Sequence, residues 1–400
     1  MRAFYFRVLN MNVYVCPICN NSDPTYIGFR NNHPYCRKCL TFKGKEENDS
    51  FREPKQVDLN LNYRLSKEQK ALSKQLIDNF KNGVDSLVKA VCGSGKTEIC
   101  FGIISYCIRH GLTVGFAVPR TNVCIELHAR FSRVFHNNKV IAVYGGHHNV
   151  LKGDLIVLTT HQLFRYKSYF DLLILDEIDA FPFKGDDVLE AIFINSVRGN
   201  FVLMSATPDN QIVSNIKKEG GEVLELYSRF HKHPLPVPNV ISGNIIYLNY
   251  KLINELSRFL KENKPVFIFV PTVDLSISLS LFLKPFFPHG TYVNSKREDR
   301  NQVIDDFRNK KYQYLVTTAV LERGVTVKDL QVIVYKADHK IYDSFSLIQI
   351  AGRVGRKIDA PEGEVIFLAR FINDEIKKAV GEINAANEKL QNMLQANKRK

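Results

Sequence analysis

The stretch Ala90-Val-Cys-Gly-Ser-Gly-Lys-Thr97 combines glycines with a lysine and a hydroxyl, after an apolar run and before a helical pattern. Glycines allow main-chain N–H groups to close around a phosphate, and a helix that begins there adds the positive end of its dipole. Lys96 can reach the β- and γ-phosphates of a nucleotide, and the Thr97 hydroxyl can bind Mg²⁺. The predicted phosphate-binding residues are Gly93, Ser94, Gly95, Lys96 and Thr97.

Acidic residues end a second apolar stretch, Leu172–Leu175. Asp176 is placed to hold Mg²⁺, and Glu177 to orient and activate the water that attacks a γ-phosphate. Carboxylates at the end of a strand are otherwise often helix caps. Their position 80 residues after Lys96 favours the catalytic interpretation.

A pair of arginines lies near the C-terminus, in Gln349-Ile-Ala-Gly-Arg353-Val-Gly-Arg356. Arginines three positions apart share one face of a helix. They can stabilise the charge that develops on a transferred phosphoryl group, as arginine fingers do. For this stretch alone, a solvated basic helix face is the better interpretation. Together with the glycine-rich loop and the acidic run, it favours catalytic roles for Arg353 and Arg356.

Upstream of the glycine-rich loop, Leu65-Ser-Lys-Glu-Gln69 offers a side chain that can both donate to and accept from adenine. Gln69 is therefore a candidate for selecting ATP. The alternative is an ordinary polar helix N-terminus with Ser66 as its cap.

Four of the eight cysteines fall within the first forty residues, as two Cys-x-x-Cys pairs separated by sixteen residues. Two such pairs suit tetrahedral Zn²⁺, because each tight turn offers two thiolates. A redox pair or incidental cysteines are the alternative, which two matched pairs disfavour. So short a segment has little core, so the metal would supply much of its folding energy. The predicted Zn²⁺ ligands are Cys16, Cys19, Cys36 and Cys39.

The 400-residue chain has a formal net charge of +14, with 45% apolar and 24% charged residues. Such a composition is typical of a globular protein with cores of its own. So basic a chain favours a polyanionic partner, with nucleic acid before an anionic membrane surface; a generally basic protein is the alternative. No uncharged apolar run reaches the roughly 20 residues that span a bilayer, and we expect a cytoplasmic protein.

Apolar runs alternate with helical patterns around these candidates, which is typical of a doubly wound parallel sheet. The first predicted strands are Leu87–Val91, Val114–Val118, Val140–Tyr144, Leu155–Thr159, Leu172–Leu175 and Phe201–Met204. Three prolines within residues 234–238 cannot join a helix or a central strand, and they predict a hinge. The later predicted strands are Ile245–Leu248, Val266–Val270, Thr291–Val293, Tyr314–Val316, Val332–Tyr335 and Val365–Leu368. The fold class expected is α/β with two such domains.

The run from Leu275 to Leu281 alternates like a strand but lies between two strand candidates, and parallel neighbours need a crossover. We therefore predict a helix there, capped by Thr272. The expected domains are a zinc-binding module (1–45), a linker (46–63), an ATP-binding domain (64–230), a proline-rich hinge (231–243), a second domain (244–371) and a C-terminal helical tail (372–400).

In this order the motifs resemble those of superfamily 2 helicases, whose glycine-rich loop also has a variant that begins with alanine, as at Ala90. The resemblance implies two RecA-like domains. It implies that Asp179, Ser205, Thr207 and Gln349 couple hydrolysis to motion, and that Gly324 contributes to ATP binding. Related DEAD-box proteins have an aspartate two residues after this glycine, and Thr326 stands there, which weakens the expected ribose contact. By analogy, the phosphate contacts with a nucleic-acid strand fall to Arg120, Thr121, Gly146, Thr160, Thr272 and Thr318.

A closer resemblance is to ComFA, the helicase-like late-competence ATPases of naturally transformable Gram-positive bacteria. It is carried by the four cysteines, by Asp176-Glu-Ile-Asp-Ala-Phe-Pro-Phe183 and by Phe267-Ile-Phe-Val-Pro-Thr272. The resemblance implies an ATPase stimulated by single-stranded DNA that acts in DNA uptake at the inner face of the cell membrane. It implies peripheral association with the membrane uptake channel, and a ComFC-type phosphoribosyltransferase-like protein as partner. A homo-oligomer is a further expectation.

Two other functions fit parts of the pattern. A replication-restart or repair helicase also couples zinc-binding cysteines to superfamily 2 motifs. A non-catalytic, zinc-dependent DNA-binding scaffold would keep the ATP site only for regulation, which the intact Lys96, Asp176, Glu177 and Arg356 disfavour.

Overall fold

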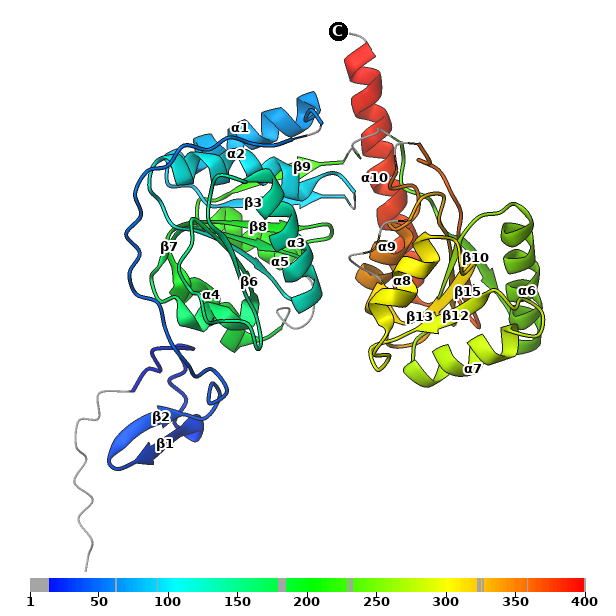
Figure 1. Ribbon diagram of the computed structural model, residues 1–400, viewed down its shortest axis with the longest axis horizontal. Coiled ribbons are helices and arrows are strands. Elements are labelled where there is room, and N and C mark those ends of the chain that lie inside the picture. The colour runs from blue at the N-terminus through cyan, green and yellow to red at the C-terminus, as the bar shows by residue number, and fades with distance from the viewer. Residues whose placement is uncertain are drawn as a thin grey trace, which may run out of the picture. The chain divides into compact units, whose positions relative to one another are not determined.

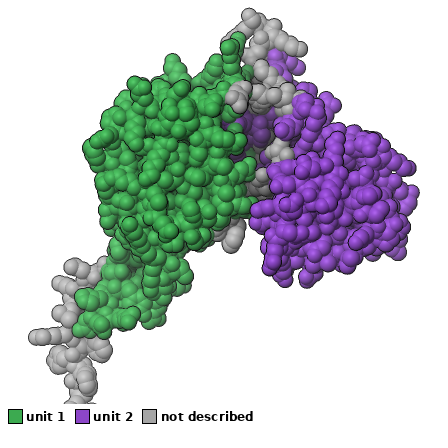
Figure 2. Space-filling view, viewed as in Figure 1, with its two compact units in different colours: residues 1–88, 99–224 green, residues 89–98, 225–400 purple. Residues whose placement is uncertain are grey.

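The computed structural model describes residues 14–61, 63–91, 93–178, 185–227, 229, 233–321, 325, 327–357 and 359–398. The chain forms two compact units (Figure 2): residues 1–88 with 99–224, and residues 89–98 with 225–400. Residues 89–98, which carry the glycine-rich loop, thus group with the C-terminal half of the chain.

The first sheet has seven strands in the order β5-β6-β4-β7-β8-β3-β9. Figure 1 labels β3, β6, β7, β8 and β9 of this sheet. β4 pairs in parallel with β6 and β7, and so do β5 with β6 and β7 with β8. In chain order the strands are β3 (Ser86–Ala90), β4 (Val114–Val118), β5 (Val140–Val143), β6 (Leu155–Thr159), β7 (Phe170–Asp176), β8 (Val197–Ser205) and β9 (Glu222–Leu226).

Helices cover both faces of this sheet. On one face, Phe101 of α2 and Phe131 of α3 pack edge to face, and Phe131 also packs on Phe116 of β4. On the other, apolar residues of α4 and α5 join a core cluster with Leu173 and Leu175 of β7. The elements are α1 (Lys67–Lys81), α2 (Lys96–Arg109), α3 (Thr121–Val134), the 3₁₀ helix η2 (Thr160–Arg165), α4 (Asp187–Ser196) and α5 (Asn210–Lys218).

The second sheet has six strands in the order β10-β15-β14-β11-β13-β12, and all five pairings are parallel. Its strands are β10 (Asn239–Ser242), β11 (Val266–Phe269), β12 (Gly290–Val293), β13 (Tyr314–Thr317), β14 (Gln331–Tyr335) and β15 (Val365–Ala369). The helical elements are α6 (Ile245–Lys261), α7 (Val273–Leu283), α8 (Arg300–Arg308), η3 (Ala319–Leu321), α9 (Ser344–Ala351) and α10 (Asp374–Lys398).

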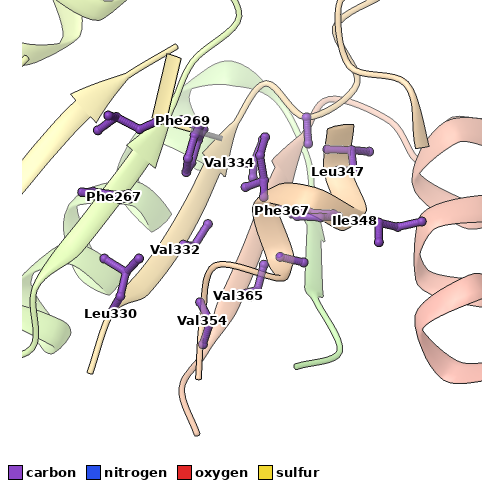
Figure 3. Packing of buried hydrophobic residues seen from close by; sticks show 14 of the residues in the cluster. Phe267, Phe269, Leu330, Val332, Val334, Leu347, Ile348, Val354, Val365 and Phe367 are labelled. Atoms are coloured by element: carbon purple, nitrogen blue, oxygen red, sulfur yellow. The ribbon is translucent and has the colours of Figure 1, made fainter. Parts of the chain in front are cut away.

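Side-chain alternation along the central strand β11 builds two cores. Phe267 and Phe269 face the layer of α8, α9 and α10 (Figure 3), whereas Val266 and Ile268 face α6 and α7. A strand that is buried on both faces has a continuous apolar sequence, and for this reason the sequence pattern predicted β11.

The structure confirms the expected α/β fold with two parallel-sheet domains, the helix after Thr272 and the C-terminal helix. The Thr272 hydroxyl accepts the Leu275 N–H at 3.2 Å, as a helix cap does.

One predicted strand is wrong: residues 245–248 form the first turn of α6. The Asn244 side chain accepts the Tyr247 N–H at 2.9 Å and starts the helix. Leu248, Leu252 and Leu256 then recur at a helical spacing that buries one face. The strand that leads into the second sheet is β10, which lies inside the segment expected to be a hinge.

Candidate functional site

The glycine-rich loop has the geometry that phosphate binding needs. Gly93 and Gly95 have φ angles of 81° and 82°, which side-chain-bearing residues rarely adopt. Helix α2 begins directly afterwards, at Lys96, so the first N–H groups of a helix follow the turn. Ser94 and Thr97 are buried.

The acidic run ends strand β7 at Asp176, which is 8% exposed. Glu177 follows with φ of 62°, an uncommon value for a residue with a side chain. Its N–H lies 2.9 Å from Asp176 Oδ1 and 3.0 Å from the Met204 carbonyl of β8, and these bonds hold the strained conformation. Strain kept by surrounding bonds is typical of functional residues. Asp179 and the Ala-Phe-Pro segment lie outside the described residues.

The strand order gathers these motifs along the first sheet. Asp176 ends β7, Ser205 ends the neighbouring strand β8, and the glycine-rich loop follows β3 on the other side of β8. The Ser205 hydroxyl is buried and accepts the Thr207 N–H at 2.9 Å, which fixes the turn after β8. Phosphate-binding, acidic and coupling residues thus follow three adjacent strands.

Gln69 takes part in a capping box at the start of α1. Its side-chain oxygen accepts the Ser66 N–H at 2.9 Å, and the Ser66 hydroxyl accepts the Gln69 N–H at 3.1 Å. The structure thus shows the helix cap that the sequence offered as the alternative. Adenine recognition by Gln69 stays a prediction.

The arginine motif follows α9, in which Gln349 is buried. Arg353 is 3% exposed and donates to the Val325 carbonyl at 3.2 Å. Arg356 donates through Nε to the Gly352 carbonyl at 2.9 Å. Both guanidinium groups thus bond main-chain carbonyls of their own unit. Gly324 and Thr326 lie outside the described residues.

The residues predicted to contact a nucleic-acid strand also follow neighbouring β-strands. Thr121 begins α3 after β4, Gly146 follows β5 and Thr160 follows β6, and these three strands are adjacent in the first sheet. Thr121 and Gly146 are exposed and Arg120 is partly exposed, but the Thr160 side chain is fully buried.

In the second sheet, Thr272 follows β11 and Thr318 follows the adjacent strand β13. Thr272 is exposed and Thr318 is buried. The better candidates for phosphate contacts are therefore Arg120 and the exposed residues Thr121, Gly146 and Thr272.

The four N-terminal cysteines converge on one buried point. Their sulfur atoms all lie within 4.8 Å of one another, with 3.4 Å between Cys16 and Cys39 and 3.6 Å between Cys19 and Cys36. A tetrahedron with metal–sulfur bonds of about 2.3 Å has sulfur–sulfur edges of about 3.8 Å, which the cluster matches. Burial raises the pKa of the Cys19 thiol to about 11, and a bound cation would favour the thiolate form of this residue. The donor set fits Zn²⁺.

The hairpin of β1 (Ile27–Arg30) and β2 (His33–Cys36) brings Cys36 into this cluster. The cluster packs on Val188 and Ala191 of α4, the helix that follows the acidic run. Asn195 of α4 donates to the Ile18 carbonyl at 3.0 Å.

A second contact of the module is Phe42, whose ring stacks on His161 of η2 with centroids 6.1 Å apart. The zinc-binding module therefore contacts α4 and η2 of the first unit, and the sequence pattern did not predict either contact.

Within the described residues, no helix combines the length and apolar character that crossing a bilayer requires.

Known proteins match both halves of the chain. Residues 62–210 match the family described as type III restriction enzyme, res subunit, and residues 250–357 match the helicase conserved C-terminal domain. Competence protein ComFA of Bacillus subtilis is 34% identical over 90% of this chain and 82% of its own length.

The ComFA protein of Streptococcus pneumoniae is also 34% identical, over 88% of this chain and 85% of its own length. Among solved structures, Saccharomyces cerevisiae Dbp5 bound to RNA and ADP BeF3 aligns with a TM-score of 0.59 at 16% identity, covering 80% of this chain and 91% of that one. This structural match supports the fold alone.

Proposed function

Because the chain belongs to the ComFA family of competence proteins, we propose that it is an ATP-driven motor that moves single-stranded DNA during uptake of transforming DNA. At the coarser level it is an ATP-hydrolysing, helicase-like enzyme of superfamily 2 that uses ATP and Mg²⁺. The observation that carries the proposal is that the two kinds of motif occupy different parts of the first sheet. The ATP motifs follow β7, β8 and β3, whereas the candidate DNA contacts follow β5, β6 and β4.

Each motif has a proposed part in hydrolysis. The N–H groups of the glycine-rich loop and Lys96 bind the phosphates, while Thr97 and Asp176 would hold Mg²⁺, which screens the phosphate charge. Glu177 orients the attacking water and takes its proton. Arg353 and Arg356 stabilise charge on the γ-phosphoryl in the nucleotide-bound state.

The proposed partners follow from family and charge. A net charge of +14 suits a DNA strand and an anionic membrane surface. A ComFC-type protein, the uptake channel and a second copy of this chain are proposed partners at the inner face of the membrane. Zn²⁺ is proposed as the ion of the cysteine cluster.

Phosphate release with and without DNA tests the proposed function. We expect single-stranded DNA to raise the ATPase rate at least about tenfold, since strand binding in such motors assembles the hydrolysis site. Translocation without strand displacement on a forked duplex would support the uptake motor, whereas displacement would support the restart-type helicase. No phosphate release under either condition would leave only the scaffold function.

Replacing Arg120 with alanine is expected to weaken DNA binding several-fold without sequence preference, because the side chain offers one phosphate contact. The slope of log Kd against log salt concentration should fall by about one. Fluorescence anisotropy with a labelled oligonucleotide measures both quantities.

Arg133→Ala is the matched control, because Arg133 lies near the other end of the same helix and is exposed. An equal loss of affinity in both variants would show that Arg120 acts only through the general positive charge of the chain.

A further inference from the structure

Arg229 is one of the largest fully buried side chains in the described chain, with 1% of its surface exposed. It lies between β9 and β10 and belongs to the same compact unit as residues 89–98. A buried guanidinium loses its hydration, so protein acceptors must replace the lost water. No pattern in the sequence marks this arginine.

The guanidinium of Arg229 holds the turn after α9. Nη1 donates to the carbonyls of Val354 at 2.8 Å and Gly355 at 3.0 Å, and Nη2 lies 3.5 Å from the Gly352 carbonyl. Carbonyls at the end of a helix lack intrahelical partners and favour a nearby cation. These three carbonyls belong to the turn that carries Arg353 and leads to Arg356. Arg229 therefore fixes the main chain of the arginine motif.

The stem of the same side chain lies close to the glycine-rich loop. A methyl group placed on Gly93 would be 3.8 Å from Nε and 4.0 Å from Cδ of Arg229, so the stem lies about one methyl group away from the loop. The Val91 N–H donates to the Leu226 carbonyl at 3.1 Å, so the end of β9 also bonds the start of this loop. One buried side chain thus bonds the turn of the arginine motif and lies close to the phosphate loop.

Gly355 fits the same arrangement. Its φ is 66°, and a methyl group there would lie 3.1 Å from Nη1 of Arg229 and 2.2 Å from the Pro361 carbonyl. Any side chain at this position would displace the turn from Arg229 or from residue 361. The close approach of this turn to the Pro361 carbonyl thus requires glycine at position 355.

We propose that Arg229 is a positioning residue that couples nucleotide binding at the glycine-rich loop to the placement of Arg353 and Arg356. This coupling role rests on the proposed function, in which the glycine-rich loop and the arginine motif act on one ATP. Phosphate binding that shifts Gly93 moves the stem of Arg229, and the guanidinium transmits this movement to the turn after α9. DNA affinity then responds to nucleotide through this side chain.

The test measures the coupling between the two ligands in the full-length chain. Anisotropy of a labelled single-stranded oligonucleotide gives Kd with and without a non-hydrolysable ATP analogue, and the ratio is the coupling factor. We expect a factor of about ten for the unaltered protein, within the usual range for coupled sites.

Arg229→Met keeps an apolar stem beside Gly93 but removes every donor to the turn. Its coupling factor should fall to within about twofold of one, while the Kd for a fluorescent ATP analogue alone changes less than about threefold. Arg229→Lys keeps the charge and some donors, so it should restore part of the coupling. Arg297→Met is the control, because Arg297 also donates to a main-chain carbonyl, that of Tyr292. Its other hydrogen bonds within the described residues are to Thr291 and Asp299.

An unchanged coupling factor in Arg229→Met, with normal coupling in Arg297→Met, would overturn the role of Arg229 alone. A parallel loss of both affinities and of thermal stability would also overturn it, since that indicates a merely structural arginine. If Arg229→Met does not fold, the Arg229→Lys protein decides by the same measurements. A coupling factor of one and no DNA-stimulated hydrolysis in the unaltered protein would reject the proposed function itself.

Discussion

Replacing Glu177 with glutamine is expected to lower DNA-stimulated ATP hydrolysis by about 10²- to 10⁴-fold, because a general base contributes on this order to catalysis. Glutamine has nearly the same shape but accepts no proton from the attacking water. ATP affinity should change little, since the phosphate contacts come from the loop before α2. Phosphate release under saturating ATP and DNA, together with the Kd of a fluorescent ATP analogue, measures the two effects.

The backbone conformation at position 177 should be the same in Glu177→Gln as in the unaltered protein. Glu177 has φ of 62° and is held by its N–H bonds to Asp176 and to the Met204 carbonyl, neither of which involves its own side chain. The strained conformation should therefore persist in Glu177→Gln, and the unfolding temperature should stay within a few degrees.

Glu126→Gln makes the same chemical change on the exposed face of α3 and should leave turnover unaltered. Turnover by Glu177→Gln at the rate of this control would remove Glu177 from the mechanism. Loss of ATP binding together with turnover would point instead to a role in holding the nucleotide.

The sequence predicts the buried strands well because both faces of a parallel sheet are covered. Runs such as Val114–Val118 and Leu155–Thr159 are therefore almost entirely apolar and coincide with β4 and β6, which are buried at every position. The order of β7, β8 and β3 then brings the predicted ATP motifs to adjacent strands. Motif spacing and sheet topology together account for this part of the candidate site.

Prediction fails where local pattern and tertiary context diverge. Ile245–Leu248 is a short apolar run that suits a strand, but the Asn244 cap and the buried leucines that follow make it a helix. β10 is a half-exposed edge strand after a proline-rich segment, and it has no strong apolar pattern.

Burial of polar side chains is also beyond local pattern. The acceptors of Arg229 lie more than 120 positions later in the chain, so the neighbouring sequence does not predict that this arginine is buried. Likewise the Thr160 hydroxyl is predicted to contact DNA, but the fold buries it.

Removing the metal from the cysteine cluster is expected to unfold residues 16–45 while the two parallel-sheet domains stay folded. A structural Zn²⁺ site supplies about 10–16 kcal/mol in small metal-binding modules. The described residues of this module form only a two-stranded hairpin and a short 3₁₀ helix (Pro24–Tyr26), with no large apolar core. Metal analysis of the purified chain should give one Zn²⁺ per molecule, and Cys36→Ser should lose it. Hydrogen exchange across residues 16–45 should then rise to the rate of an unfolded segment.

The effect should extend beyond the module, because the cluster packs on Val188 and Ala191 and the Ile18 carbonyl accepts from Asn195. Exchange in α4 should therefore rise as well, whereas α2 should keep its protection. Cys107→Ala is the matched control: Cys107 is buried in α2, outside the cluster, and its loss should leave the Zn²⁺ content at one. Full metal content in Cys36→Ser, or unchanged exchange of residues 16–45 after chelation, would refute the zinc assignment. Changes confined to residues 16–45 would keep the zinc site but show that the module does not brace α4.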